Sequence, residues 1–207
     1  MRESYSTQET GFVCCREGGG KVVIVGGRGA LGRRFVSLFQ RSGFAVSVLE
    51  QTDWPQAAEI CADAALVLLA VPIAVTDQVI AMLPKLPADC VLADITSIKA
   101  QPLSAMLARH NGPVVGLHPM FGPDITNLVK QVVVVCHGRG ESEYQWLLKQ
   151  LNVWGAELAV KHAAEHDSAM QLIQAMRHFS SLVYGVHLAD ENADLNELLQ
   201  LSSPIYR

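Results

Sequence analysis

A glycine-rich loop between a strand pattern and a helix pattern constrains the fold most. Residues 21–25 (KVVIV) form a short apolar strand pattern, and residues 30–42 carry apolar side chains at helical spacing. Between them Gly27, Gly29 and Gly32 form G-x-G-x-x-G. In this setting the motif is typical of dinucleotide-binding folds. We expect Gly27 to permit the tight turn, Gly29 to let a pyrophosphate approach the backbone, and Gly32 to let the helix pack on the sheet.

Strand and helix patterns continue to alternate after this loop. The alternation predicts a Rossmann-type, mostly parallel sheet with helices on both faces. Further strands are expected over residues 44–50, 65–71, 90–94, 114–117, 132–136 and 157–160, and helices over residues 54–63, 75–83, 100–110 and 142–154.

The predicted domains follow from where this alternation begins and ends. Residues 1–20 lack apolar periodicity and are interpreted as a tail or linker, and residues 21–161 as the dinucleotide-binding domain. A long helix over residues 163–190 has no strand left to cover, so residues 162–207 should start an all-helical second domain. Because the sequence stops where another helix should begin, we expect the chain to be a fragment of a longer protein.

Composition excludes several classes of protein. The net charge of −4 argues against a general affinity for nucleic acid or an anionic membrane surface. The longest apolar stretch, residues 64–75, is too short to span a bilayer. The five cysteines form neither a C-x-x-C pair nor a metal-ligand pattern with the histidines. We therefore expect a cytoplasmic protein with reduced cysteines and no metal site.

An acidic residue at the end of the second predicted strand indicates the cofactor. Glu50 follows Gly32 by 18 positions, close to the spacing of the acid that binds the ribose hydroxyls in dinucleotide folds. A carboxylate there favours NAD over NADP, although Arg28, Arg33 and Arg34 could partly reverse that preference. The alternative is an ordinary solvated strand-end glutamate. The remaining expected cofactor contacts are Arg28, Ala30 and Leu31 in the loop and Val71 and Pro72 at the third strand end.

A histidine at a strand end is the main catalytic candidate. His118 follows a predicted strand and is held by Pro119. Open α/β sheets bind ligands in a crevice beyond the carboxyl ends of their strands, so the ring should lie at the mouth of that crevice, in one cavity with the glycine loop. Histidine suits proton transfer because it titrates near neutral pH. Ser97 and Lys99 follow another strand end. Ser97 is either the N-cap of the helix beginning near residue 100, or a site residue, or both.

Several segments together resemble prephenate dehydrogenases, from about residue 21 to residue 207. The resemblance is closest to the dehydrogenase part of the bacterial bifunctional chorismate mutase/prephenate dehydrogenases, and the opening MRESYS looks like the end of a mutase domain. Because the rest of that domain is absent, no mutase activity is expected. The segments are VVIVGGRGALG, LLAVPI, DITSIK, GLHPMFGPD, AAEHDSAM, QAMRHF and LSSPIYR.

The resemblance implies NAD-dependent oxidative decarboxylation of prephenate to 4-hydroxyphenylpyruvate, in tyrosine biosynthesis. It implies that His118 accepts a hydrogen bond from the ring hydroxyl of the substrate and that Ser97 orients His118. Lys99 belongs to the same motif, and His178 and Arg207 match positions in the substrate pocket. His166 is a weaker candidate, because it lies roughly 120° around the helix from His178.

The resemblance also implies limits on activity. The family's further helical domain, which supplies homodimer contacts and another substrate-binding arginine, would lie beyond Arg207. Lys99 and Arg207 remain as cations for the two carboxylates of prephenate, so we expect NAD binding with little or no turnover. Two alternatives stay open: a catalytically silent NAD-binding module, and a β-hydroxyacid dehydrogenase. The second usually needs a lysine in the long helix, and residues 163–190 contain none.

Overall fold

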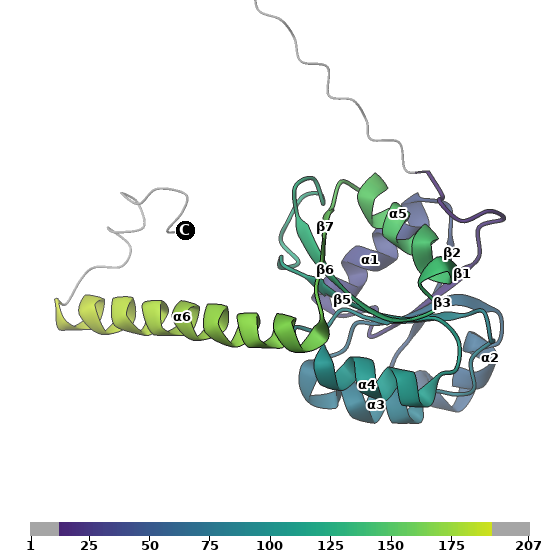
Figure 1. Ribbon diagram of the computed structural model, residues 1–207, viewed down its shortest axis with the longest axis horizontal. Coiled ribbons are helices and arrows are strands. Elements are labelled where there is room, and N and C mark those ends of the chain that lie inside the picture. The colour runs from purple at the N-terminus through teal and green to yellow at the C-terminus, as the bar shows by residue number, and fades with distance from the viewer. Residues whose placement is uncertain (1–12, 192–207) are drawn as a thin grey trace, which may run out of the picture. The chain divides into compact units, whose positions relative to one another are not determined.

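A seven-stranded sheet forms the centre of the molecule (Figure 1). The computed structural model describes residues 13–191. The strand order is β2-β1-β3-β4-β5-β6-β7, and only the β5–β6 pair is antiparallel. The strands are β1 (Lys21–Val25), β2 (Ala45–Leu49), β3 (Ala64–Leu69), β4 (Val91–Asp94), β5 (Val114–Pro119), β6 (Val132–Arg139) and β7 (Glu157–Val160). The predicted Rossmann-type sheet is therefore confirmed.

Helices cover both faces of the sheet, with α1 and α5 on one face and α2, α3 and α4 on the other (Figure 1). Their bounds are α1 (Ala30–Arg41), η1 (Gln51–Gln56), α2 (Ala57–Cys61), η2 (Ile73–Val75), α3 (Thr76–Met82), α4 (Ala100–Arg109), η3 (Glu141–Tyr144), α5 (Gln145–Val153) and α6 (Ala163–Asp190). Strand alternation explains the two cores. In β1, Val22 and Ile24 pack toward α1, whereas Val23 and Val25 pack toward α2 and α3.

The carboxyl ends of the parallel strands are held level with one another. The amide of Gly26 donates to Leu49 O (3.0 Å), that of Ala70 to Val25 O (2.8 Å), and that of Ile95 to Leu69 O (3.0 Å). Each chain segment that leaves a strand is thus tied to the neighbouring strand. The segments that follow β1 to β5 consequently emerge along one edge of the sheet, where open α/β sheets bind ligands.

Several predicted boundaries differ from the structure. Residues before 21 are not all a tail, because the amide of Cys15 donates to Gln150 Oε1 (2.9 Å) and Gln150 Nε2 donates to Val13 O (3.0 Å). The helix expected over residues 54–63 is divided into η1 and α2. In addition, the division between two compact units falls after Asp167, inside α6, rather than after residue 161.

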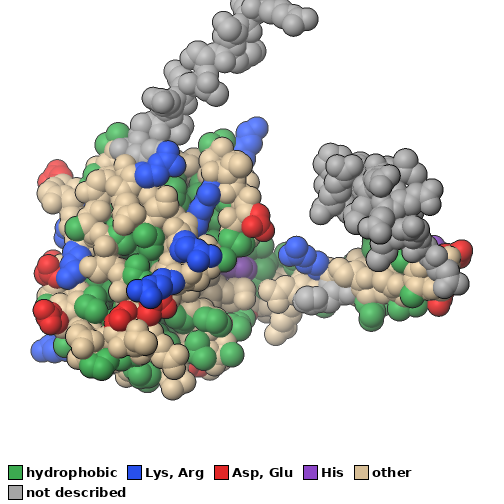
Figure 2. All heavy atoms as spheres, turned by 180° about the vertical axis from the view of Figure 1, so that it is seen from behind, with side chains coloured by type: hydrophobic (Ala, Val, Ile, Leu, Met, Phe, Trp, Pro, Cys, Tyr) green, Lys and Arg blue, Asp and Glu red, His purple; other side chains and the backbone are tan. Residues whose placement is uncertain are grey.

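The part of α6 that belongs to the second unit exposes apolar side chains. They are Leu172, Ile173, Met176, Phe179, Leu182, Val183, Tyr184 and Val186, and green side chains are visible along this helix in Figure 2. A helix with this much uncovered apolar surface needs a partner to bury it. None of the helices within residues 13–191 is both long and apolar enough to cross a membrane.

Candidate active site

The loop between β1 and α1 turns at Gly26. Gly26 has a φ of +78°, and a Cβ there would lie 2.6 Å from Ala70 O. The prediction that Gly27 permits the turn is therefore wrong. Gly27 is required for another reason, because a Cβ there would lie 2.8 Å from the side chain of Val48 on β2. The two adjacent glycines serve conformation and packing separately.

The start of α1 lies against this turn. A Cβ on Gly32 would overlap the carbonyl oxygen of Gly26, so Gly32 allows the close contact of helix and loop that the motif predicts. Gly29 is the N-cap of α1, and no side chain caps this end. Ala30 and Leu31 form the first turn, whose amides have no partners within the helix. These amides and the helix dipole can bind a phosphate.

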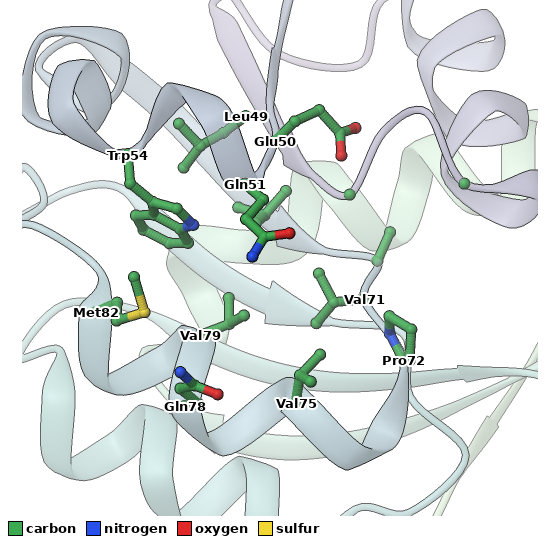
Figure 3. A pocket seen from close by; sticks show the side chains of 14 residues that line it. Leu49, Glu50, Gln51, Trp54, Val71, Pro72, Val75, Gln78, Val79 and Met82 are labelled. Carbon is green, nitrogen blue, oxygen red and sulfur yellow. The ribbon is translucent and has the colours of Figure 1, made fainter.

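A cavity of about 360 Å³ opens between the ends of β1, β2 and β3 and the helix α3. Of the predicted cofactor contacts, Gly29, Glu50, Val71 and Pro72 line it. Gly27, Arg28, Ala30, Leu31 and Gly32 do not. Figure 3 shows Gln51 pointing into the cavity. Its remaining lining residues are Val25, Gly26, Leu49, Trp54, Ala70, Val75, Gln78, Val79 and Met82.

The wall of the cavity opposite the β1–α1 loop is apolar, and the sequence patterns did not predict it. Trp54, Val79 and Met82 form much of it (Figure 3). The sequence patterns place Trp54 only at the start of the helix expected over residues 54–63, and Val79 and Met82 only within the helix expected over residues 75–83. Helical spacing alone does not single out Met82, because its exposure is known only from the structure. A flat apolar slot beside polar groups is the usual form of a small-molecule site.

Glu50 is fixed at the edge of this cavity. Its Oε1 accepts a hydrogen bond from the backbone N–H of Arg28 (2.7 Å), and its own amide donates to Asp53 Oδ2 (2.9 Å). Glu50 as a whole is half-buried, and the hydrogen bond that its carboxylate accepts is exposed to solvent. The carboxylate is therefore held against the glycine loop.

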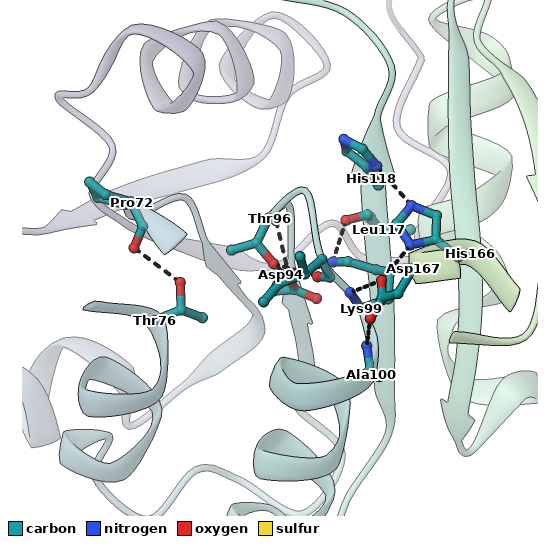
Figure 4. A network of polar contacts seen from close by, with 11 residues as sticks. Pro72, Thr76, Asp94, Thr96, Lys99, Ala100, Leu117, His118, His166 and Asp167 are labelled. Carbon is teal, nitrogen blue, oxygen red and sulfur yellow. Dashed lines mark hydrogen bonds and ion pairs between the residues drawn. The ribbon is translucent and has the colours of Figure 1, made fainter. Parts of the chain in front are cut away.

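His118, near the end of β5, is hydrogen-bonded to another histidine. Its ring is nearly buried, and its Nδ1 lies 2.8 Å from Nε2 of His166. Nδ1 of His166 lies 2.8 Å from Oδ1 of Asp167 (Figure 4). We call these residues the His–His–Asp triplet. His166 and Asp167 lie in the first turns of α6, within the same compact unit as β5.

Asp167 also holds the start of α4. Its Oδ1 accepts the amide of Lys99 (2.7 Å) and its Oδ2 the amide of Ala100 (2.9 Å). The N-cap position of α4 is Lys99, so the alternative of Ser97 as N-cap is wrong. The hydrogen bonds of residues 13–191 include none from Ser97 to His118. Sequence reasoning ranked His166 low and missed Asp167.

Lys99 is buried in an ion pair. Its side chain has no exposed surface, and Nζ contacts Asp94 Oδ2 and donates to Leu117 O (2.7 Å). Burial lowers the pKa of Lys99, and Asp94 opposes this effect. A Cβ on Gly116 would lie 3.2 Å from Lys99 Cδ, so this glycine makes room for the side chain. The expectation that Lys99 binds a substrate carboxylate does not fit this burial.

Burial and neighbouring charge keep His118 neutral. Burial is the main cause that lowers its pKa from 6.5 to about 4, and His166 and Lys99 lower it further while Asp167 opposes them. Near neutral pH the ring is therefore a base that can accept a proton.

The triplet and the cavity share one face of the sheet but not one pocket. Leu117 packs toward α1 and α5, so the adjacent His118 projects to the other face, where Leu49 and Val25 also pack. His118 does not line the cavity, so a single enclosed cavity is not observed. His178 lies on α6, but its side chain, like Arg207, lies outside the described residues. No cluster able to hold a metal ion occurs within the described part of the chain.

The sheet, the glycine loop, the acidic end of β2 and the nearly buried, neutral His118 together define a nucleotide-binding domain of the Rossmann type. The chain belongs to the prephenate dehydrogenase family. The family model described as "Prephenate dehydrogenase, nucleotide-binding domain" matches residues 44–161, which is more than half of the chain. The match includes Glu50 and His118, whereas the glycine loop lies before it.

Known proteins resemble the whole of this sequence. It is 55% identical to the T-protein of Enterobacter agglomerans and 47% identical to that of Haemophilus influenzae, with all of this chain covered in each case. It spans 56% and 55% of those relatives' lengths. A solved prephenate dehydrogenase from A. aeolicus, in complex with hydroxyphenyl propionate and NAD+, shares the fold with a TM-score of 0.67 at 17% identity. That alignment covers 89% of this chain and 71% of the other.

Proposed function

We propose that this chain is the nucleotide-binding part of an NAD-dependent prephenate dehydrogenase that carries the catalytic base. The observation that carries the proposal is His118. It is a neutral, nearly buried histidine at the strand-end edge of the sheet that also carries the glycine loop. Family membership supports the assignment, as does the complex of the A. aeolicus enzyme with NAD+.

The loop and cavity fit a dinucleotide. There is no room for a side chain on Gly26, where the loop meets the end of β3, or on Gly32, where α1 meets the loop, and the uncapped start of α1 suits a pyrophosphate. The carboxylate of Glu50, which is hydrogen-bonded to the loop, suits ribose hydroxyls and would repel a 2′-phosphate, which favours NAD over NADP. Trp54 and Met82 offer an apolar slot for a flat ring. When bound, NAD would supply the hydride acceptor.

In the proposed mechanism His118 takes the proton of the C4 hydroxyl of prephenate. The hydride leaves the same carbon, so the hydroxyl becomes a carbonyl. The bond between the ring and its carboxylate then breaks, carbon dioxide leaves, and the electron pair makes the ring aromatic and turns the C4 carbonyl into a phenolate. The phenolate takes the proton back from His118, which gives 4-hydroxyphenylpyruvate and restores the neutral ring. His118 can perform its part because it is unprotonated near neutral pH. General-base help of this kind contributes about 10²–10⁴-fold in rate.

The roles of other predicted residues stay part of the proposal. Ser97 would orient His118, and His178 and Arg207 would bind the substrate from the helical side. Because Lys99 is committed to Asp94, a buried substrate carboxylate needs cations from elsewhere, and leaving one unpaired costs several kcal/mol. Turnover of prephenate therefore depends on cations other than Lys99.

The cellular setting is proposed as well. Five free cysteines, three of them buried, support a reducing, cytoplasmic compartment. The exposed apolar side chains of α6 support a homodimer of the parent protein, with a second copy covering them.

Two measurements test the proposal, and both are made on each form of the protein. Quenching of tryptophan fluorescence reports dinucleotide binding, because Trp54 lines the cavity. Absorbance of NADH reports prephenate-dependent turnover, in this chain and in a form extended through further helices. We expect NAD binding in both and efficient turnover in the extended form. Binding without turnover in both would indicate a silent NAD-binding module.

A further inference from the structure

The His–His–Asp triplet has a defined direction of hydrogen bonding. Asp167 accepts the amides of Lys99 and Ala100. Although burial raises the pKa of Asp167, these hydrogen bonds and the one from His166 lower it below its ordinary value, so the carboxylate is ionised near neutral pH. An ionised carboxylate only accepts hydrogen bonds. The nitrogen of His166 that faces it, Nδ1, must therefore carry a hydrogen.

The remaining protons follow from the partners. A neutral imidazole has one donor and one acceptor nitrogen, so a neutral His166 with a hydrogen on Nδ1 presents Nε2 as an acceptor. That Nε2 lies 2.8 Å from Nδ1 of His118, which must then donate. The other nitrogen of His118, Nε2, is left with a free electron pair. From this geometry we infer that Asp167 and His166 are positioning residues that fix His118 in the tautomer with Nδ1 protonated and Nε2 free to accept a proton.

Burial makes this arrangement specific. His166 is 2% exposed and His118 9% exposed, so water competes little for either ring. The rings are nearly perpendicular, with an interplanar angle of 82°, and they meet through one nitrogen of each, 2.8 Å apart. A third group that orients a base is the same logic as in the Ser-His-Asp triad, where the aspartate sets the tautomer of the histidine. The tautomer does not depend on the proposed dehydrogenase function, whereas its effect on rate does.

Nuclear magnetic resonance of the chain labelled with ¹⁵N-histidine tests the tautomer without any assay of activity. Nitrogen shifts distinguish protonated from unprotonated ring nitrogens, and loss of signals in His118→Gln assigns that residue. At pH 7 we expect His118 to be protonated at Nδ1 only. In His166→Phe, His118 should revert to the Nε2-protonated form that free histidine favours in water, whereas Asp167→Glu, which keeps the anion, should retain the wild-type signals.

A matched control separates positioning from general damage to the fold. His137 is another partly buried histidine, on β6, with a hydrogen bond to Tyr144 (2.7 Å). His137→Gln should leave the His118 signals unchanged. Wild-type His118 protonated at Nε2, as expected if His166 were a doubly protonated donor, would overturn the inference. Unchanged His118 signals in a folded His166→Phe variant would also overturn the inference. If that variant does not fold, the wild-type tautomer and Asp167→Glu decide.

Kinetics test the catalytic consequence separately. In the form that turns over prephenate, His166→Phe should lower kcat by up to about 10²–10⁴-fold, the usual contribution of general-base catalysis, with KM for NAD unchanged. If the tautomer is as inferred but no form turns over prephenate, the proposed function fails and the positioning stands. If turnover is normal and the tautomer differs from the one inferred, the positioning role fails and the proposed function stands.

Discussion

The ammonium of Lys99 and the carboxylate of Asp94 form an ion pair with no access to solvent. Lys99 also donates to the carbonyl of Leu117, the residue before His118. A single buried side chain thus joins the exits of β4 and β5 and supports the position of His118.

Removing Lys99 should destabilise the protein strongly. In Lys99→Met the Asp94 carboxylate stays buried and unpaired, which typically costs about 3–5 kcal/mol. Urea unfolding measures the loss. The double variant Lys99→Met/Asp94→Leu should recover much of it, because no charge remains buried. The matched control is Lys21→Met, which breaks the more exposed pair with Asp63 and should cost far less. Equal costs at the two sites would argue against an important role for the buried pair.

Substitution of Gly26 should impair nucleotide binding. In Gly26→Ala the new Cβ meets Ala70 O at 2.6 Å, and the left-handed conformation is unfavourable for alanine by about 1–2 kcal/mol. The loop must shift, and NAD affinity should fall. Gly43→Ala is the control, since Gly43 has a φ of +84° but nothing lies within 4 Å of an added Cβ. The Gly43→Ala variant should lose stability but keep its affinity for NAD. Wild-type NAD affinity in folded Gly26→Ala would contradict the role of this turn.

Glu50→Gln should weaken the preference for NAD. Glutamine can still accept the Arg28 amide, so the loop stays in place while the charge is removed. Hydrogen bonds to charged groups contribute about 1.5–3 kcal/mol, so NAD affinity should fall roughly tenfold or more while NADP affinity is retained or rises. Paired titrations with both dinucleotides measure this, with exposed Glu59→Gln as the control. An unchanged ratio of the two affinities would exclude Glu50 from ribose recognition.

The low pKa of His118 should appear in the pH dependence of stability and rate. With a folded pKa of about 4 and an ordinary value of 6.5, the unfolded chain binds more protons between these values. The contribution of His118 to stability is therefore complete above pH 6.5 and is lost as the pH falls toward 4. Lys99, His166 and Asp167 are the charged or titratable groups acting on it.

Urea unfolding at pH 7 and pH 5 checks the sign. His118→Asn should lose less stability than the wild type between these two pH values, because it lacks the titrating ring. The acid limb of kcat/KM should likewise lie well below pH 6.5. An acid limb near 6.5, together with equal pH slopes of stability, would show that His118 titrates as an ordinary exposed histidine.

The sequence predicted the sheet better than the details of the site. Strand alternation and helical spacing are local patterns, so they identify elements and strand ends such as those at Glu50 and His118. The choice between Gly26 and Gly27 for the turn depends on one φ angle that no spacing encodes. The burial of Lys99 depends on room left by Gly116, 17 positions away in the sequence.

His166 illustrates a second limit of the sequence. A helical wheel separates it from His178 but does not tell which side of the helix meets the sheet. Only the packing of the first turns of α6 beside β5 places His166 next to His118. Asp167 was missed because its partners are mostly backbone amides of a distant helix start, and amides carry no sequence signal.

The most direct measurement is a comparison of His118→Asn with the wild type, in the form of the protein that turns over prephenate. NAD affinity and prephenate-dependent NADH formation are measured on the same samples. Asparagine fills a similar volume but cannot take the proton, so we expect unchanged NAD affinity and a fall in kcat of about 10²–10⁴-fold. Turnover at the wild-type rate would contradict the assignment of His118 as the base.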